Sequence, residues 1–249
     1  MQANENFVSP PAEGRRKPDP IAPWLHLAGL LVIGAAVTGL GLLAQRGHAG
    51  GAASGQLASH SQAIPIYFTA IVMDWALFYY CWVGVHRRGG SLWSLSGGRW
   101  TSWRGVAVDL AIALPFWIVW EGAAYAVATL LGPSSAKSVD SLLPHSLFEI
   151  LLWSATCVTA GICEEIVFRG YLQRQLHALG GSIAAAVASQ GVIFGIFHGY
   201  QGWKNVITIS VLGILFGLLA AWRKNLRANM IVHAWADFWE GWLKFLVFR

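Results

Sequence analysis

The chain alternates between long apolar runs and short polar breaks. A run of roughly 20 apolar residues can cross the hydrocarbon of a bilayer as a helix, because a helix satisfies all of its own backbone hydrogen bonds. About seven such runs are present, the fifth short and the last interrupted by polar residues; they are Pro23–Ala44, Ala63–Val85, Val106–Leu131, Leu147–Phe168, Ile183–Phe197, Val206–Trp222 and Ala228–Phe248. The pattern therefore predicts an all-α fold, a polytopic transmembrane helical bundle of about seven spans with interfacial helices.

The polar segments predict how the chain is organised. Residues 1–22 are polar and proline-rich and are expected to form a cytoplasmic tail. The apolar run that follows is too long for a signal-peptide core, so we expect it to be retained as the first span. The break His86–Arg104 interleaves tryptophans with arginines, which favours a segment lying on the inner membrane interface. Residues 23–249 are then one transmembrane bundle, without a second domain.

The basic residues set the expected orientation. Most of the 17 Lys and Arg residues lie in alternate polar breaks, beginning with the N-terminal tail. Under the positive-inside rule this predicts a multi-pass protein of a plasma membrane of the bacterial inner-membrane type, with a cytoplasmic N-terminus. The net charge of +5 is spread over short clusters and forms no single stripe, so nucleic acid is not an expected partner.

The composition agrees with a membrane protein. Hydrophobic residues make up 55% of the chain and charged residues 12%, whereas an ordinary soluble domain has roughly 25% charged residues. The three cysteines lie in or at the edge of apolar runs and lack CxxC or Cys/His zinc spacing, so we expect reduced core residues.

Charged side chains inside membrane spans are costly, so those present point to chemistry. Glu164 and Glu165 stand side by side near the end of the fourth run, and Arg169 follows Glu165 at the i, i+4 spacing of one helical face. Successive helical residues diverge by about 100°, so one carboxylate is expected to face a site while the other pairs with Arg169. The carboxylate that faces the site suits a general base.

Two further pairs occupy the segments that follow. Phe194 and His198 share a face at the end of the fifth run, and His233 and Asp237 share a face of the last one. Taken by itself, His198 would be read as an ordinary packed histidine. His233 and Asp237, taken by themselves, would be read as a hydrogen-bonded pair inside the bundle. A common site requires either a fourth helix that extends beyond the membrane or a steeply tilted fifth helix, and we expect the extension, from about Pro144 to Leu179.

The ordered set EExxxR, FxxxH and HxxxN/D resembles the CPBP family, the CAAX-protease and bacteriocin-processing membrane proteins related to the Ras-converting CAAX endopeptidase. Here the motifs read Glu164-Glu165-Ile-Val-Phe-Arg169, Phe194-Gly-Ile-Phe-His198 and His233-Ala-Trp-Ala-Asp237. The motif-bearing protease core covers about 147–248, while the first three spans match only in being apolar. The resemblance implies an intramembrane endopeptidase with its site in a cavity between helices.

The resemblance also implies roles for individual residues. Glu164 would be the base that activates water, and His198 would position that water. His233 and Asp237 would hold the scissile carbonyl or its oxyanion, with the supporting residues Glu165, Arg169 and Phe194. The expected substrate is a hydrophobic or lipidated peptide or protein, surrounded by membrane lipid.

One departure and one alternative bear on the mechanism. The last motif position is often Asn in the family, and an amide can donate a hydrogen bond to an oxyanion, whereas ionised Asp237 only accepts. Asp237 would then be protonated, orient His233 or bind metal. Zinc is the alternative cofactor, with Glu164, His198, His233 and Asp237 as its ligands. The resemblance favours a glutamate mechanism without metal, and no HExxH pair is present.

Two other functions compete with proteolysis. A proton-coupled transporter would use Glu164, His198 and His233 as a relay, but no inverted repeat is visible. A bacteriocin-immunity or partner-binding protein of the same family would keep the motifs without catalysis. The single intramembrane carboxylates Asp74 and Glu121 are left without an assigned role.

Overall fold

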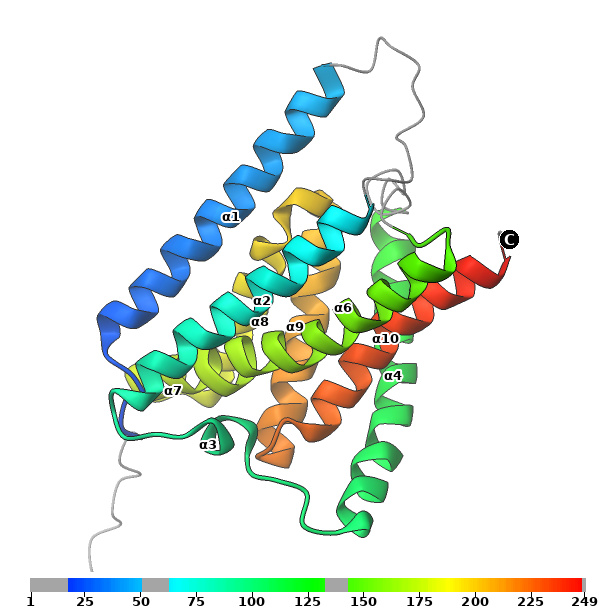
Figure 1. Cartoon of the computed structure of the whole chain (residues 1–249). Helices are drawn as coiled ribbons and strands as arrows, with labels where there is room; N and C mark the ends of the chain where they lie inside the picture. Colours follow the sequence, from blue (N-terminus) through cyan, green and yellow to red (C-terminus); the bar gives the residue numbers. More distant parts are fainter. Residues whose placement is uncertain (1–17, 51–62, 133–142, 248–249) are drawn as a thin grey trace, which may run out of the picture.

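The computed structural model describes residues 18–50, 63–132 and 143–247, and this part of the chain folds into helices with no strand. Most of the predicted N-terminal tail lies outside the described residues. The helices along the chain are α1 (Trp24–Gly50), α2 (Ala63–His86), α3 (Leu92–Ser96), α4 (Trp103–Leu131), α6 (Leu147–Glu164), η2 (Glu165–Leu172), α7 (Gln173–Gly180), α8 (Ile183–Phe197), η3 (Gly199–Gln201), α9 (Trp203–Arg223) and α10 (Arg227–Val247) (Figure 1).

The predicted membrane bundle is confirmed as a fold class. Within the described residues, five helical segments are long and apolar enough to span a bilayer: α1, α2, α4, the continuous helix that begins with α6, and α9. The short α8, with 15 residues, and the more polar α10 occupy the other two runs in which the sequence predicts spans, so the number of seven stays a prediction. The protein is therefore an integral, multi-pass membrane protein.

The longest helix carries the paired glutamates. It begins at Leu147, where the Ser146 side chain accepts a hydrogen bond from the Glu149 amide at 3.2 Å, and it continues to Gly180. The predicted continuation of this helix to about Leu179 is thus confirmed. An eight-residue π-helix, η2, which the sequence did not predict, interrupts it directly after Glu164. Such π segments widen the helical turn and are frequent at functional sites.

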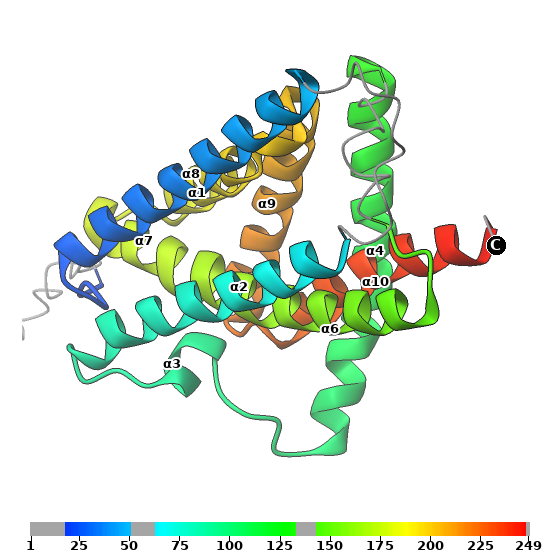
Figure 2. The ribbon, with the colours of Figure 1, turned by 45° about the horizontal axis from the view of Figure 1, so that its top comes forward.

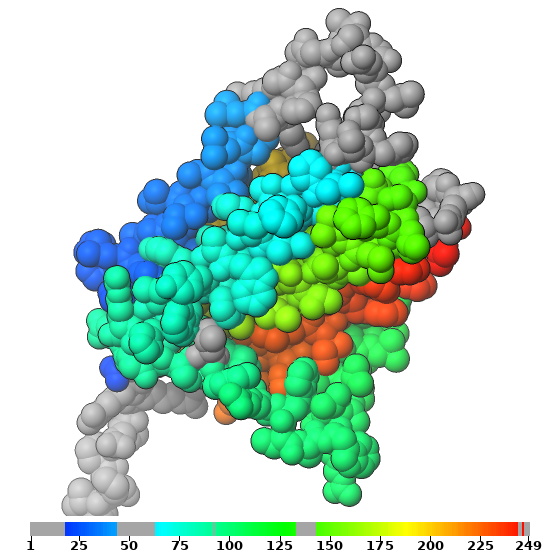
Figure 3. Space-filling model, viewed as in Figure 1, coloured from blue at the N-terminus to red at the C-terminus, as the bar shows by residue number. Residues whose placement is uncertain are grey.

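Three helices lie side by side in one layer of the bundle. Figure 2 shows α2, α6 and α10 running side by side across the directions of α4 and α9, and Figure 3 shows α1, α2, α6 and α10 next to one another on one face. Trp153 on α6 joins the layer, because its ring meets Tyr67 of α2 edge-on at 5.5 Å and its Nε1 donates to the Asp237 carbonyl at 3.1 Å.

Two arginines near the connection between α9 and α10 meet a buried carboxylate at one end of the bundle. Asp109, near the start of α4, is fully buried. It accepts hydrogen bonds from Arg223 at 2.8 Å, from Arg227 at 2.9 Å and from the Trp100 indole at 2.8 Å. This cluster of ion pairs ties α4 to the connection between α9 and α10.

The helices α8 and α9 approach closely through glycines, and both helices carry the GxxxG spacing that suits close helix packing. A Cβ atom at Gly191 would lie 2.7 Å from the Ile214 backbone nitrogen and 2.6 Å from its side chain. Backbone cannot move aside cheaply, so we expect Gly191→Ala to lower the free energy of unfolding by about 1–3 kcal/mol.

Denaturant titration in detergent measures this effect. The matched control is Gly122→Ala on α4, where an added Cβ meets nothing within 4 Å. Equal stabilities for the two variants would contradict the close approach of α8 and α9.

Candidate active site

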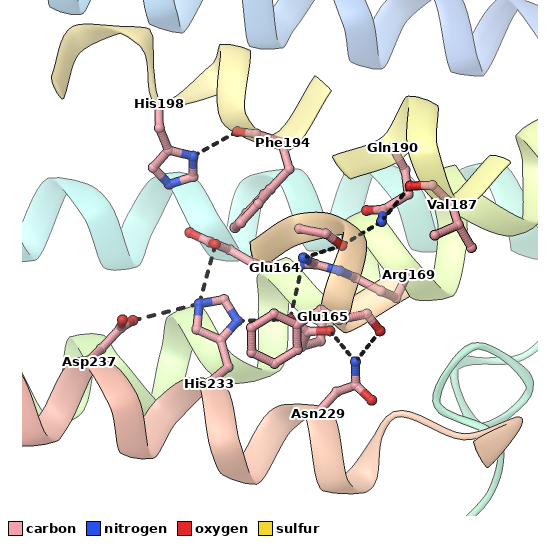
Figure 4. Close-up of polar contacts among 12 residues, drawn as sticks. Glu164, Glu165, Arg169, Val187, Gln190, Phe194, His198, Asn229, His233 and Asp237 are labelled. Atoms are coloured by element: carbon pink, nitrogen blue, oxygen red, sulfur yellow. Dashed lines mark hydrogen bonds and ion pairs between the residues drawn. The ribbon is translucent and has the colours of Figure 1, made fainter. Parts of the chain in front are cut away.

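Four elements bring the predicted site residues together. Glu164 ends α6 and Glu165 begins η2, while His198 follows the last turn of α8, and His233 and Asp237 lie one turn apart on α10. Figure 4 shows these side chains facing a common centre. The structure therefore joins all three motifs in one place.

Glu165 is the buried anchor of the site. Its carboxylate is fully buried and accepts hydrogen bonds from Arg169 at 3.0 Å and from Nδ1 of His233 at 2.8 Å. The Asn229 amide donates to its other oxygen at 3.2 Å. The predicted pairing with Arg169 is present. The expected role of Glu165 was incomplete, because this carboxylate also fixes the orientation of His233.

Arg169 contacts aromatic side chains as well as Glu165. Its guanidinium carbon lies 4.4 Å from the centre of the Phe194 ring and 5.0 Å from that of Phe216. A desolvated cation gains energy from aromatic faces. Arg169, predicted as a supporting residue of the site, is 1% exposed.

His233 stands between the two carboxylates that border the open side of the site. Its Nε2 lies 3.7 Å from Glu164 and 3.6 Å from Asp237. Both distances exceed those of ordinary hydrogen bonds, so neither carboxylate occupies this nitrogen fully. Solvent exposure increases outward from the imidazole: the side chains are 6% exposed in His233, 19% in Glu164 and 35% in Asp237.

His198 presents one nitrogen to Glu164. Its Nδ1 lies 2.8 Å from the Phe194 carbonyl oxygen. A carbonyl only accepts, so Nδ1 carries the hydrogen, and Nε2 of the neutral ring keeps its lone pair. Figure 4 shows the open edge of this ring directed toward Glu164. Two hydrogen-bond acceptors thus face each other, an arrangement in which one water molecule can donate to both.

Aromatic side chains enclose the polar centre. The Phe194 ring meets the His198 ring edge-on at 4.7 Å, and the rings of Phe216 and Trp120 lie 5.3 and 6.2 Å from His233. Phe194, predicted as a supporting residue, therefore contacts a motif histidine and the arginine. A wall of this kind excludes bulk water and strengthens the electrostatic interactions inside.

The turn after His198 adds a phenol at the edge of the site. Tyr200 lies in η3, and its ring centre is 6.1 Å from that of His198. Burial raises the pKa of Tyr200 above its ordinary value, and nearby carboxylates act in the same direction. The phenol therefore stays neutral and able to donate a hydrogen bond.

Sequence reasoning missed Asn229, which orients Glu165 and also donates to the Phe216 carbonyl at 2.9 Å. Its spacing was a usable signal, because Asn229, His233 and Asp237 follow at i, i+4 and i+8 on one helical face. Glu121, by contrast, is exposed on α4 and accepts a hydrogen bond from the Trp117 indole at 2.9 Å, outside the site.

The donor set bears on the zinc alternative. Among the described residues, no three His, Cys, Asp or Glu side chains are grouped so that they could hold a metal ion. Nδ1 of each histidine is already bonded, to Glu165 in His233 and to the Phe194 carbonyl in His198, so only Nε2 is available in each. Zinc dependence is a matter for the chelator experiment below.

Comparison with known proteins identifies the segment that carries the site. Residues 146–239 match the family model described as type II CAAX prenyl endopeptidase Rce1-like. The match runs from the residue that caps α6 to the middle of α10, and so includes every motif residue. Curated proteins and solved structures gave no significant match.

Proposed function

We propose that this chain, whose residues 146–239 match the Rce1-like family of type II CAAX prenyl endopeptidases, hydrolyses a peptide bond in a hydrophobic, lipidated or membrane-anchored substrate. At family level it is a CAAX-type intramembrane protease. The observation that supports the assignment of residues is the convergence of Glu164, His198 and His233 on one centre inside a helical membrane bundle.

Water is activated between Glu164 and His198. A water molecule that donates one hydrogen to the carboxylate and the other to Nε2 of His198 keeps an oxygen lone pair free for attack. Glu164 takes the proton as the new bond to the scissile carbon forms, which is general base catalysis, and returns it to the leaving amine as the C–N bond breaks. The surrounding aromatic wall limits competing bulk water.

His233 stabilises the charge that develops on the carbonyl oxygen. The bond from Nδ1 to Glu165 fixes the ring, as the carboxylate of a catalytic triad fixes its histidine, and leaves Nε2 to face the substrate. A protonated Nε2 donates a hydrogen bond to the oxyanion. Such a preorganised donor contributes about 10²–10³-fold to the rate.

Asp237 lies beside the same nitrogen, 3.6 Å from Nε2, and so acts on the substrate side of His233. In its neutral form it donates a second hydrogen bond to the oxyanion. We therefore expect Asp237→Asn, which keeps a donor, to retain cleavage within a few-fold. Asp237→Ala, which removes the donor, should reduce kcat by about 10²-fold or more.

The pH profile of kcat separates the two roles of Asp237. The Asn variant cannot ionise, so its activity should persist to higher pH than that of wild type. A loss of activity in Asp237→Asn as large as in Asp237→Ala would instead indicate that a negative charge is required there, as in a metal site.

The function is tested with purified protein in liposomes, using prenylated, acylated and hydrophobic-tailed peptides with and without a strong chelator. Cleavage that survives the chelator and is lost in Glu164→Gln supports the metal-free glutamate mechanism. Cleavage that the chelator abolishes and zinc restores assigns His198, His233 and Asp237 to a metal site. If no peptide is cleaved, the proposed function is wrong, and binding or flux measurements then distinguish an immunity protein from a carrier.

A further inference from the structure

An apolar groove with a volume of about 430 Å³ opens between α4, α6 and α10. All of its lining residues are apolar, and they include Leu110 and Leu114 of α4, Val158 of α6, and Trp235 and Phe238 of α10. Leu110, Leu114 and Val158 are each more than half exposed, so the groove is open to the outside of the bundle. For a bundle that spans a membrane, this outside is the hydrocarbon of the bilayer, and an apolar chain can enter from there.

The groove and the candidate active site lie on opposite faces of α10. Ile231 and Trp235 line the groove, whereas His233 and Asp237 face the site. Each helical residue turns by about 100°, so a residue two positions from His233 points about 200° away from it. A molecule in the groove is therefore separated by α10 from the proposed site of cleavage. This separation favours a component of the bilayer as the occupant over the chain of a substrate.

One end of the groove lies at the ion-pair cluster of Asp109. On α4, Asp109 directly precedes Leu110, and on α10, Arg227 lies one turn before Ile231. The Asp109 carboxylate joins the two helices, because it accepts from Nε of Arg227 at 2.9 Å and from Arg223 at 2.8 Å. Figure 1 shows the first turns of α4 and α10 at the same end of the bundle. The groove thus begins at a pair of arginines.

These arginines keep positive charge for a further anion. Arg223 and Arg227 bring two positive charges to the single negative charge of Asp109. Their side chains are 22% and 20% exposed, so both guanidinium groups extend from the buried carboxylate to the surface. Nε of Arg223 has no hydrogen-bond partner among the described residues. A guanidinium has five N–H donors whose geometry suits phosphate oxygens. The cluster is therefore fixed in place and still able to bind phosphate.

The same end of the bundle carries exposed tryptophans. Trp100, Trp103 and Trp222 lie beside the arginines in sequence and are exposed. Tryptophan and arginine together are typical of the level of the lipid headgroups. From Arg227 to Phe238 the groove follows α10 for about 16 Å, at 1.5 Å per residue. This is about half of the roughly 30 Å of hydrocarbon in a bilayer, and so about the depth of one leaflet.

We infer that the groove binds an anionic phospholipid of the bilayer, with its phosphate at Arg223 and Arg227 and one acyl chain between α4 and α10. The charge excess of the arginines selects a negative headgroup, and basic pockets between membrane helices are suited to such headgroups. The apolar lining buries the chain. The lipid supports α10 on the face opposite to His233. The inference does not depend on the proposed function, because lipid binding requires no substrate.

The headgroup is tested by lipid titration of the full-length protein in detergent, followed by native mass spectrometry. The probes are phosphatidylglycerol and phosphatidylcholine with identical acyl chains. Wild type should bind one phosphatidylglycerol about five-fold or more tightly than phosphatidylcholine, the effect expected of one unpaired arginine near a headgroup. Arg223→Gln removes the excess positive charge but leaves Asp109 paired with Arg227, so the preference should nearly disappear.

The matched control for the charge is Arg88→Gln, the same loss on the exposed turn that follows α2, and it should keep the preference. Equal binding of the two lipids by wild type overturns the inference, as does a preference that persists in folded Arg223→Gln. If Arg223→Gln does not fold, the wild-type preference and the groove variants below decide.

The acyl chain is tested by filling the groove. Leu114→Trp places a large ring in it and should weaken phosphatidylglycerol binding by about ten-fold or more, because several methylene groups lose their buried contact. The matched control is Ile118→Trp, one turn further along α4, where the side chain is as exposed as Leu114 but lies outside the groove. Thermal unfolding in detergent checks that both variants fold.

Two results would assign the groove differently. Equal binding by Leu114→Trp and Ile118→Trp would show that the lipid belongs to the general lipid layer around the bundle, and the inference would be wrong. A lipidated peptide that displaces phosphatidylglycerol from wild type would assign the groove to the substrate, which also overturns the inference. Neither result bears on cleavage by Glu164, which is measured separately.

Discussion

Glu164→Gln should reduce kcat by about 10²–10⁴-fold, the usual contribution of a general base. The amide has nearly the shape of the carboxyl and still accepts a hydrogen bond, but it cannot take a proton from water. Binding is expected to change little, so the loss should fall on kcat more than on KM. Rates are measured in liposomes with whichever lipidated or hydrophobic peptide wild type cleaves.

Two comparisons make this result specific. Glu121→Gln is the same chemical change at an exposed intramembrane position on α4 and should leave the rate unchanged. Glu164→Gln should also keep the thermal stability of wild type, because the Glu164 side chain holds no partner closer than the 3.7 Å contact with His233 among the described residues. A folded Glu164→Gln protein that cleaves at the wild-type rate would show that another residue is the base.

Arg169→Met should cost about 3–5 kcal/mol of stability. The substitution keeps much of the apolar side-chain length but leaves Glu165 as a fully buried carboxylate without its cation. The substitution also removes the cation that lies over the rings of Phe194 and Phe216. The unfolding free energy in detergent, measured by denaturant titration, checks the prediction.

The double variant Arg169→Met/Glu165→Gln isolates the cause. It removes both buried charges at once, and replacing a whole buried ion pair is far less costly than breaking it. Most of the lost stability should therefore return, while cleavage should remain impaired, because the neutral amide that replaces the Glu165 carboxylate no longer stabilises a protonated His233. If the single and double variants are equally unstable, the shape of the Arg169 side chain, and not its charge, determines the stability at this position.

Together these contacts describe a site in two layers. The inner layer is Arg169, Glu165 and Asn229, whose hydrogen bonds are made within the protein and hold His233 in place. The outer layer is Glu164, His198 and Asp237, whose functional atoms face one another without filling their hydrogen-bonding capacity. Preorganisation of this kind suits hydrolysis, since the inner groups need not move during the reaction.

Local patterns in the sequence were enough to locate the helices. The second span was expected at Ala63–Val85 and is observed at Ala63–His86, because a run of apolar residues ends where arginines begin. Helix α9 begins at Trp203, three residues before the predicted start. The prediction began later because the first turn, which contains Lys204 and Asn205, is not apolar enough to count toward a span. The π-helix had no such signal, since it depends on how Glu165 through Leu172 pack against their neighbours.

The sequence by itself determined the all-helical membrane bundle, the long fourth helix and the three motifs, and the i, i+4 spacing already placed Glu165 with Arg169 and His233 with Asp237. These features have a period of one or two helical turns, so neighbouring residues are sufficient to specify them. Only the tertiary structure decided that Glu165 orients His233, 68 residues away. Such contacts depend on the direction and register in which helices pack, and these are set by the fit of whole surfaces to one another.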